Sequence, residues 1–190
     1  MRRMHFTRIV VFFFCVWSAA SLAAAADDSF PTGQKLESAH FLIYSDPQVD
    51  LTALFQSLDV GLGEALLVNE PGIKGDNLPV VLDALYSRIA ATLDMNLYSL
   101  RCMLKICRND AHLKSVARVV LDREVEAPSF YVYEMNTIYI SAEHFTKEVL
   151  GHEIAHAIIS HYFVVQPPAK VAEILSGYVE YELRKLSRQP

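Results

Sequence analysis

Two histidines and a glutamate stand at helical spacing in the segment EVLGHEIAHAIISHY, residues 148–162. His152 and His156 are one turn apart, so on a helix both imidazoles face the same way and can bind one metal ion. Glu153 is rotated by about 100° from His152 and can lean toward a water on that ion. The H-E-x-x-H pattern therefore predicts a zinc site with Glu153 as general base, and an ordinary amphipathic helix is the alternative interpretation.

The next helix is expected to supply a third ligand. The first helix should end near Phe163, because a proline pair follows at 167–168 and the residue before a proline avoids helical geometry. A second helix can begin at these prolines. At 1.5 Å per residue, His156 to Phe163 rises by about 10 Å and the prolines to Glu173 return by about 9 Å. Glu173 thus comes back to the level of His156, which predicts a zinc site of His152, His156 and Glu173 with a fourth position open for water.

The elements that must position these residues indicate an α+β domain. Alternating and helical periodicities predict a strand starting at His40, helices after Asp50 (through Leu62) and at Pro79, and a strand over 100–107. A short helix within 110–121 and a hairpin of 130–133 with 137–140 follow, directly before the motif helix. We therefore expect a small domain in which a short mixed sheet places a β-hairpin next to the motif helix and the glutamate-bearing helix.

The first 26 residues have the pattern of a secretory signal peptide. A basic start precedes an apolar core and a run of small residues that ends at Ala26. We expect an exported chain, periplasmic or secreted, with residues 27–190 as one domain. No later apolar run reaches the roughly 18 residues of a membrane span. Removing the three arginines of the segment changes the net charge from −5 to −8, which makes nucleic acid a poor partner.

The two cysteines after the signal segment are expected to be separate thiols. Cys102 and Cys107 lie in an alternating stretch, LRCMLKIC, that reads as a half-buried strand. On a strand an odd offset points the two sulfurs to opposite faces. Five residues also separate the Cα atoms by roughly 16 Å, beyond the reach of a disulfide.

The motif region resembles a known group of enzymes. GHEIAHAI followed by PPAKVAEILSGYVE is similar to the gluzincin metallopeptidases, in particular the small bacterial peptidase-MA-like domains, with H-E-x-x-H, a proline-containing turn and E-G-L-A-x-Y. The resemblance is strongest over residues 128–183. It implies a zincin-like fold, His152, His156 and Glu173 as zinc ligands, Glu153 as general base, and a peptide or protein substrate.

Two features depart from the larger gluzincins. Sixteen residues, 157–172, separate His156 from Glu173, fewer than in thermolysin-like enzymes, and Gly177 stands where those enzymes carry an aspartate that supports a ligand. Glu148, one turn before His152, is a candidate for that support, and an exposed position is the alternative.

A peptidase also needs a neutral donor for the developing oxyanion, for which Tyr133, Tyr139 and Tyr162 are candidates. The alternative function is a zinc-stabilised binding or assembly factor with little turnover. An open cleft beside the hairpin at 129–140 would distinguish the two functions.

Overall fold

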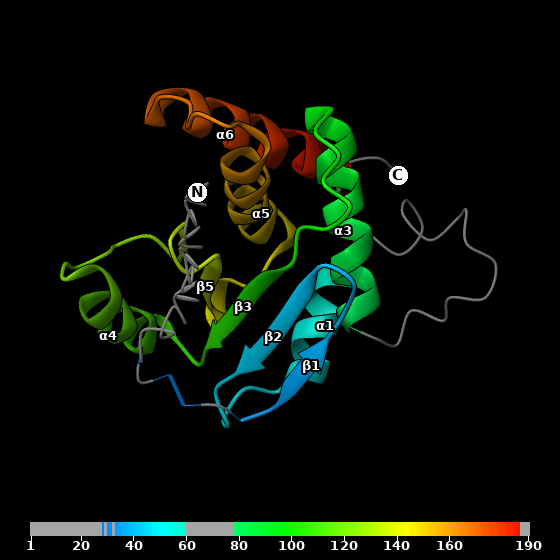
Figure 1. The fold of residues 1–190 in the computed structure, drawn as a ribbon. Coiled ribbons are helices and arrows are strands. Elements are labelled where there is room, and N and C mark those ends of the chain that lie inside the picture. Colours follow the sequence, from blue (N-terminus) through cyan, green and yellow to red (C-terminus); the bar gives the residue numbers. More distant parts are fainter. Residues whose placement is uncertain (1–27, 29, 32, 60–77, 187–190) are drawn as a thin grey trace, which may run out of the picture.

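The computed structural model describes residues 28, 30–31, 33–59 and 78–186 of the 190-residue chain. The expected signal segment, 1–26, lies outside these residues. Within the described part a mixed sheet of five strands is packed between α-helices (Figure 1). None of the described helices combines the length and the apolar character needed to cross a membrane.

The sheet has the strand order β1-β2-β3-β5-β4. Its three central strands, β2, β3 and β5, are parallel to one another, whereas β1 and β4 are antiparallel edge strands. The mixed sheet and the hairpin before the motif helix are therefore confirmed, while β1 was not predicted. The bounds are Lys35–Glu37 for β1, Phe41–Ser45 for β2, Cys102–Cys107 for β3, Ser129–Val132 for β4 and Thr137–Ser141 for β5.

Five α-helices are described, and each was expected from the sequence. Asp50 begins the first of them, because its Oδ1 accepts a hydrogen bond from the Thr52 backbone N–H at 2.9 Å. The expected continuation of this helix to Leu62 lies outside the described residues. The bounds are Leu51–Asp59 for α1, Leu78–Leu93 for α3, Asp110–Leu121 for α4, Lys147–Tyr162 for α5 and Ala169–Leu186 for α6.

The helices form layers on the two faces of the sheet. α4 covers one face, and α1, α3 and α5 pack on the other, with α6 lying across α5 and α3 (Figure 1). Cys102 belongs to the core under α3 and α5, whereas Cys107 belongs to the core under α4. Both cysteines are buried and free. The prediction of two separate thiols on opposite faces is therefore confirmed.

Local sequence signals set the ends of the motif helix and its contact with α6. Thr146 caps α5, with its Oγ1 accepting from the Val149 N–H at 3.3 Å. The helix ends at Phe163, whose extended backbone leads toward the prolines. Inside α5, Gly151 lies against Leu183 of α6 so closely that a Cβ would meet the leucine Cδ1 at 2.2 Å. The absence of a side chain at Gly151 lets the two helices approach next to His152.

Candidate metal centre

The structure brings together the three residues predicted as metal ligands. The Nε2 atoms of His152 and His156, on adjacent turns of α5, lie 3.1 Å apart. Glu173 of α6 places its Oε2 atom 3.5 Å from His152 Nε2 and its Oε1 atom 3.5 Å from His156 Nε2. Among the described residues these three form the one group of histidine, cysteine and acidic side chains close enough to hold an ion.

The spacing of the donor atoms fits a tetrahedral zinc site. Ligands at 2.0–2.1 Å from a tetrahedral ion lie roughly 3.3–3.4 Å from each other. The two Nε2 atoms lie 3.1 Å apart and each lies 3.5 Å from a different oxygen of Glu173, distances close to that value. With one donor atom from each residue, all three lie within 4.8 Å of one another. Burial lowers the pKa of His156, and the neighbouring His152 lowers it further, which favours the neutral imidazole that metal binding requires. Two imidazoles and one carboxylate are also the donor set of open, catalytic zinc sites.

A second carboxylate of α6 lies behind the first histidine. Glu180 Oε2 is 3.5 Å from His152 Nδ1, on the side of the ring opposite to the ligand atom. Glu180 also pairs with Arg184 one turn later on the same helix. The 3.5 Å contact is an ion-pair distance and not a hydrogen bond. A carboxylate on this side of the ring favours the tautomer that leaves Nε2 free to bind metal. Glu148, one turn before His152, is the residue predicted for this role from the sequence, and its role stays a prediction. Glu180 stands seven residues, or two turns, after Glu173, and that spacing was the available signal.

Glu153 lies beside the metal ligands and is held by the edge strand. Its Oε1 accepts a hydrogen bond from Ser129 Oγ at 2.7 Å, and the backbone N–H of Tyr131 is a further donor. The side chain is 7% exposed. Burial raises the pKa of Glu153, against the opposing effects of the Ser129 hydrogen bond and of His152. A raised pKa makes this carboxylate a stronger base than an exposed glutamate.

A cleft of about 440 Å³ adjoins the metal ligands. Its lining residues come from α5, from the start of α6, and from the chain that runs from the end of α4 into β4. This size is within the usual range for ligand sites. The lining residues are Arg123, Val125, Ala127, Ser129, Phe130, Tyr131, His152, Glu153, His156, Ala169, Ala172 and Glu173.

None of the three tyrosines offered as oxyanion donors lines this cleft. Tyr139 is fully buried under α4, and its hydroxyl donates to Asp28, which also pairs with Lys105. Tyr133 and Tyr162 are about half exposed outside the cleft. Tyr139 is therefore excluded as a candidate, because β5 turns that side chain away from the face that carries α5.

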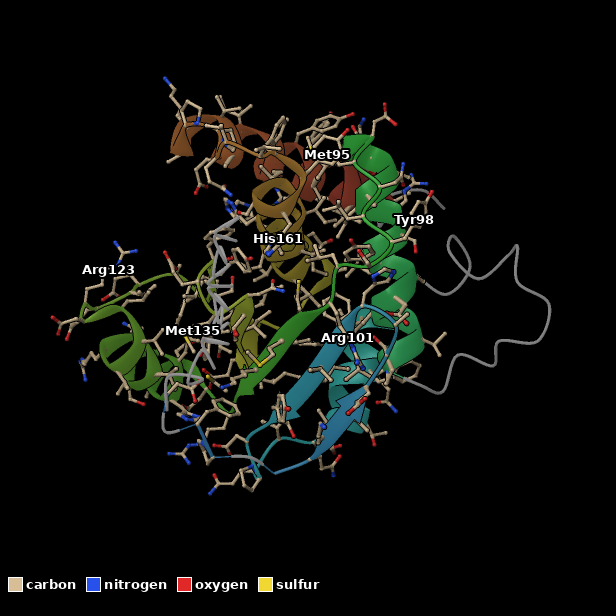
Figure 2. All side chains as sticks on the ribbon, in the orientation of Figure 1. Met95, Tyr98, Arg101, Arg123, Met135 and His161 are labelled. Carbon is tan, nitrogen blue, oxygen red and sulfur yellow. The ribbon has the colours of Figure 1, made fainter. Side chains whose placement is uncertain are left out.

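Tyr131 is the tyrosine that lines the cleft. Its hydroxyl donates to Asn136 Oδ1 at 3.2 Å and lies 3.4 Å from His161 Nδ1. His161, labelled in Figure 2, is exposed and is not part of the ligand group.

Comparison of the chain with protein-family models, with curated proteins and with solved structures found no match. The geometry of the ligands, of Glu153 and of the cleft is therefore what supports a function for this chain.

Proposed function

We propose that this protein is an exported zinc-dependent peptidase of gluzincin type with a zincin-like fold. The observation that carries the proposal is the convergence, at the edge of one cleft, of three zinc-type donor atoms within 4.8 Å of one another. Glu153, a buried carboxylate that is not one of the donors, adjoins them in the same cleft. An isolated structural zinc site would use a fourth protein ligand and would not need the cleft.

In this proposal His152, His156 and Glu173 hold the ion, and each protein group has a separate role. Bound zinc would lower the pKa of a water to about 7 and polarise the substrate carbonyl. Glu153 accepts the proton of the attacking water and delivers it to the nitrogen of the leaving amine, so that the proton count balances. Ser129 holds the Glu153 carboxylate through its hydrogen bond to Oε1.

The edge strand supports a peptide as the substrate. β4 is the last strand of the sheet and pairs with β5 on one side only, while Ser129, Phe130 and Tyr131 line the cleft. An extended peptide can add to such an edge through main-chain hydrogen bonds, with pockets for alternate side chains. The scissile peptide bond would then lie next to Glu153, which is hydrogen-bonded to Ser129 of this strand.

The test is metal content and turnover of the purified chain. We expect about one zinc per chain, and weaker zinc binding in His156→Ala and Glu173→Ala, because each variant loses one of three protein ligands. Glu153→Gln should keep zinc and the fold while turnover of a peptide library falls by roughly 10²- to 10⁴-fold. Glu182→Gln, which changes an α6 glutamate paired with Lys185 outside the ligand group, is the matched control.

Two results would contradict the proposal. Stoichiometric zinc with native affinity in both ligand variants would remove the site. Equal turnover by the native chain and Glu153→Gln would show that the hydrolysis comes from elsewhere.

A zinc-stabilised binding factor remains the second candidate function. The hydrogen bond from Ser129 to Glu153 favours it, because a buried carboxylate satisfied in this way also stabilises the contact of α5 with β4. Zinc binding without any turnover, together with a large loss of stability in Glu153→Gln, would favour this function over the peptidase.

A further inference from the structure

The chain that leads from α4 into β4 borders the cleft. Glu124 pairs with Arg118 of α4 at 2.6 Å, and Glu126 pairs with Lys114 of α4 at 2.6 Å. Neither glutamate lines the cleft. The residues of this segment that do so are Arg123, Val125, Ala127, Ser129, Phe130 and Tyr131. The segment therefore forms one wall of the cleft, while two of its glutamates contact α4.

Arg123 carries the positive charge on this wall. It follows Asp122, whose left-handed backbone with φ of 51° ends α4 and turns the chain toward the cleft. In Figure 2, Arg123 lies where the chain leaves α4, and its side chain points upward, away from that helix. The two glutamates that follow it in the chain, Glu124 and Glu126, are paired with side chains of α4. Within the described residues the Arg123 guanidinium has no ion pair or hydrogen bond of its own.

The charges of the cleft leave Arg123 uncompensated. Among the cleft-lining residues described, Arg123 is the one lysine or arginine, and Glu153 and Glu173 are the carboxylates. The charge of a divalent ion is balanced by these two carboxylates, so the guanidinium adds one net positive charge to the loaded cleft. A guanidinium binds a carboxylate through paired hydrogen bonds, which makes a carboxylate the matching group on a ligand.

We infer that Arg123 selects peptides that carry a carboxylate in the cleft, an inference that rests on the proposed peptidase function. Arg123 lies six residues before Ser129, which contacts Glu153. At about 3.3 Å per residue, the wall between them is at most roughly 20 Å long. A peptide that lies extended along this wall also advances about 3.3 Å per residue. The recognised carboxylate therefore lies within six residues of the peptide bond that faces Glu153, either on an acidic side chain or at the C-terminus.

The experiment measures peptide binding rather than turnover. Glu153→Gln protein, which holds peptides without cleaving them, is titrated by fluorescence anisotropy with labelled 12-residue peptide pools, in equimolar zinc and again in a chelator. One pool is degenerate in Ala, Ser, Leu, Phe and Glu, and its partner contains Gln in place of Glu. Each pool is made with a free and with an amidated C-terminus, which separates side-chain from terminal carboxylates.

We expect the pools that carry the recognised carboxylate to bind about three- to tenfold more tightly, between the effect of an exposed ion pair and that of a charge-assisted hydrogen bond. Adding Arg123→Gln should abolish the preference, and Arg123→Glu should transfer it to a pool with Lys in place of Glu. Arg88→Gln, on the exposed side of α3 outside the cleft, changes the net charge equally and should keep the preference.

Three results would overturn the role of Arg123: equal binding of all pools, no binding of any pool, or an equal loss of preference in Arg88→Gln. Hydrolysis by the native chain is followed in parallel to separate this inference from the proposed function. A preference that depends on Arg123 without any hydrolysis rejects the peptidase and keeps the carboxylate site. Hydrolysis that depends on Glu153 without the preference rejects the carboxylate site alone.

Discussion

Replacing Glu180 by Gln should weaken zinc binding although Glu180 is not a ligand. Its Oε2 lies 3.5 Å from His152 Nδ1, while His152 Nε2 belongs to the ligand group. A carboxylate behind a histidine ligand holds the ring and its tautomer, and losing such a partner costs about 10- to 100-fold in metal affinity. Gln keeps the size of the side chain but removes its charge, so the variant isolates the electrostatic part of the contact.

The effect on stability follows from mass action. At a free zinc concentration 100 times the native Kd, binding stabilises the folded chain by about 2.7 kcal/mol. A thirtyfold weaker Kd, in the middle of the expected range, leaves about 0.9 kcal/mol at the same concentration. For a domain of this size the difference corresponds to a zinc-induced rise in Tm that is smaller by about 5 °C.

The assay is competition with a zinc-binding dye, supported by thermal unfolding with and without zinc. Glu182→Gln is the matched control, because Glu182 is on the same helix but pairs with Lys185. A Kd within twofold of the native value in Glu180→Gln would refute the role of Glu180. An equal loss in Glu182→Gln would show a general effect of charge on α6 instead.

Three further predictions concern the stability of the chain and the accessibility of its cysteines. Asp28→Ala should destabilise the chain by about 3 kcal/mol at neutral pH, because it leaves the buried end of Lys105 unpaired. Burial raises the pKa of Asp28, but the hydrogen bonds from Lys105 and its other donors outweigh burial and lower the pKa below 3.8. The difference in free energy of unfolding between the native chain and the variant should therefore persist above pH 3.8 and shrink as pH falls through the lower folded-state pKa. Urea unfolding at several pH values measures it. Gly151→Ala should lower the free energy of unfolding by about 1–3 kcal/mol, because the new methyl group clashes with Leu183. Gly177→Ala, which has open space around it, should raise the free energy of unfolding by up to about 1 kcal/mol. Denaturant unfolding measures both. The two buried cysteines of β3 should resist a thiol reagent in the folded chain, and both should react after unfolding without reductant. Protection of both cysteines in the unfolded monomer would contradict the assignment of free thiols.

Local periodicity was enough to predict most of the fold that positions the site. The α4 helix was expected within 110–121 and is observed at Asp110–Leu121, where Asn109 Oδ1 accepts from the His112 N–H at 2.9 Å. The β1 strand was missed because it has three residues and forms only by pairing with β2, a contact that sequence periodicity does not report. Short strands of this kind depend on their neighbours in the sheet.

The residues proposed as ligands were predictable from the sequence, and the groups around them were not. His152, His156 and Glu173 follow from helical spacing and from the length of the turn between two helices. To predict Glu180 behind His152, one must know which way the glutamate side chain points. Helical spacing alone does not specify that direction. Tyr139 was misplaced for a different reason. Its neighbours Ile138 and Ile140 belong to the core under α5, so alternation along β5 places Tyr139 under α4, and that pattern was present in the sequence.

The site depends on the packing of α6 as well as on the motif of α5. α6 provides both Glu173, the third proposed ligand, and Glu180, the carboxylate behind His152. Its approach to α5 is close because Gly151 has no side chain at the contact with Leu183. A shift of α6 would move the third ligand and the support of the first ligand together. Metal affinity and the packing of the two helices should therefore change in parallel, and zinc should stabilise the α5–α6 pair more than the opposite face of the sheet under α4.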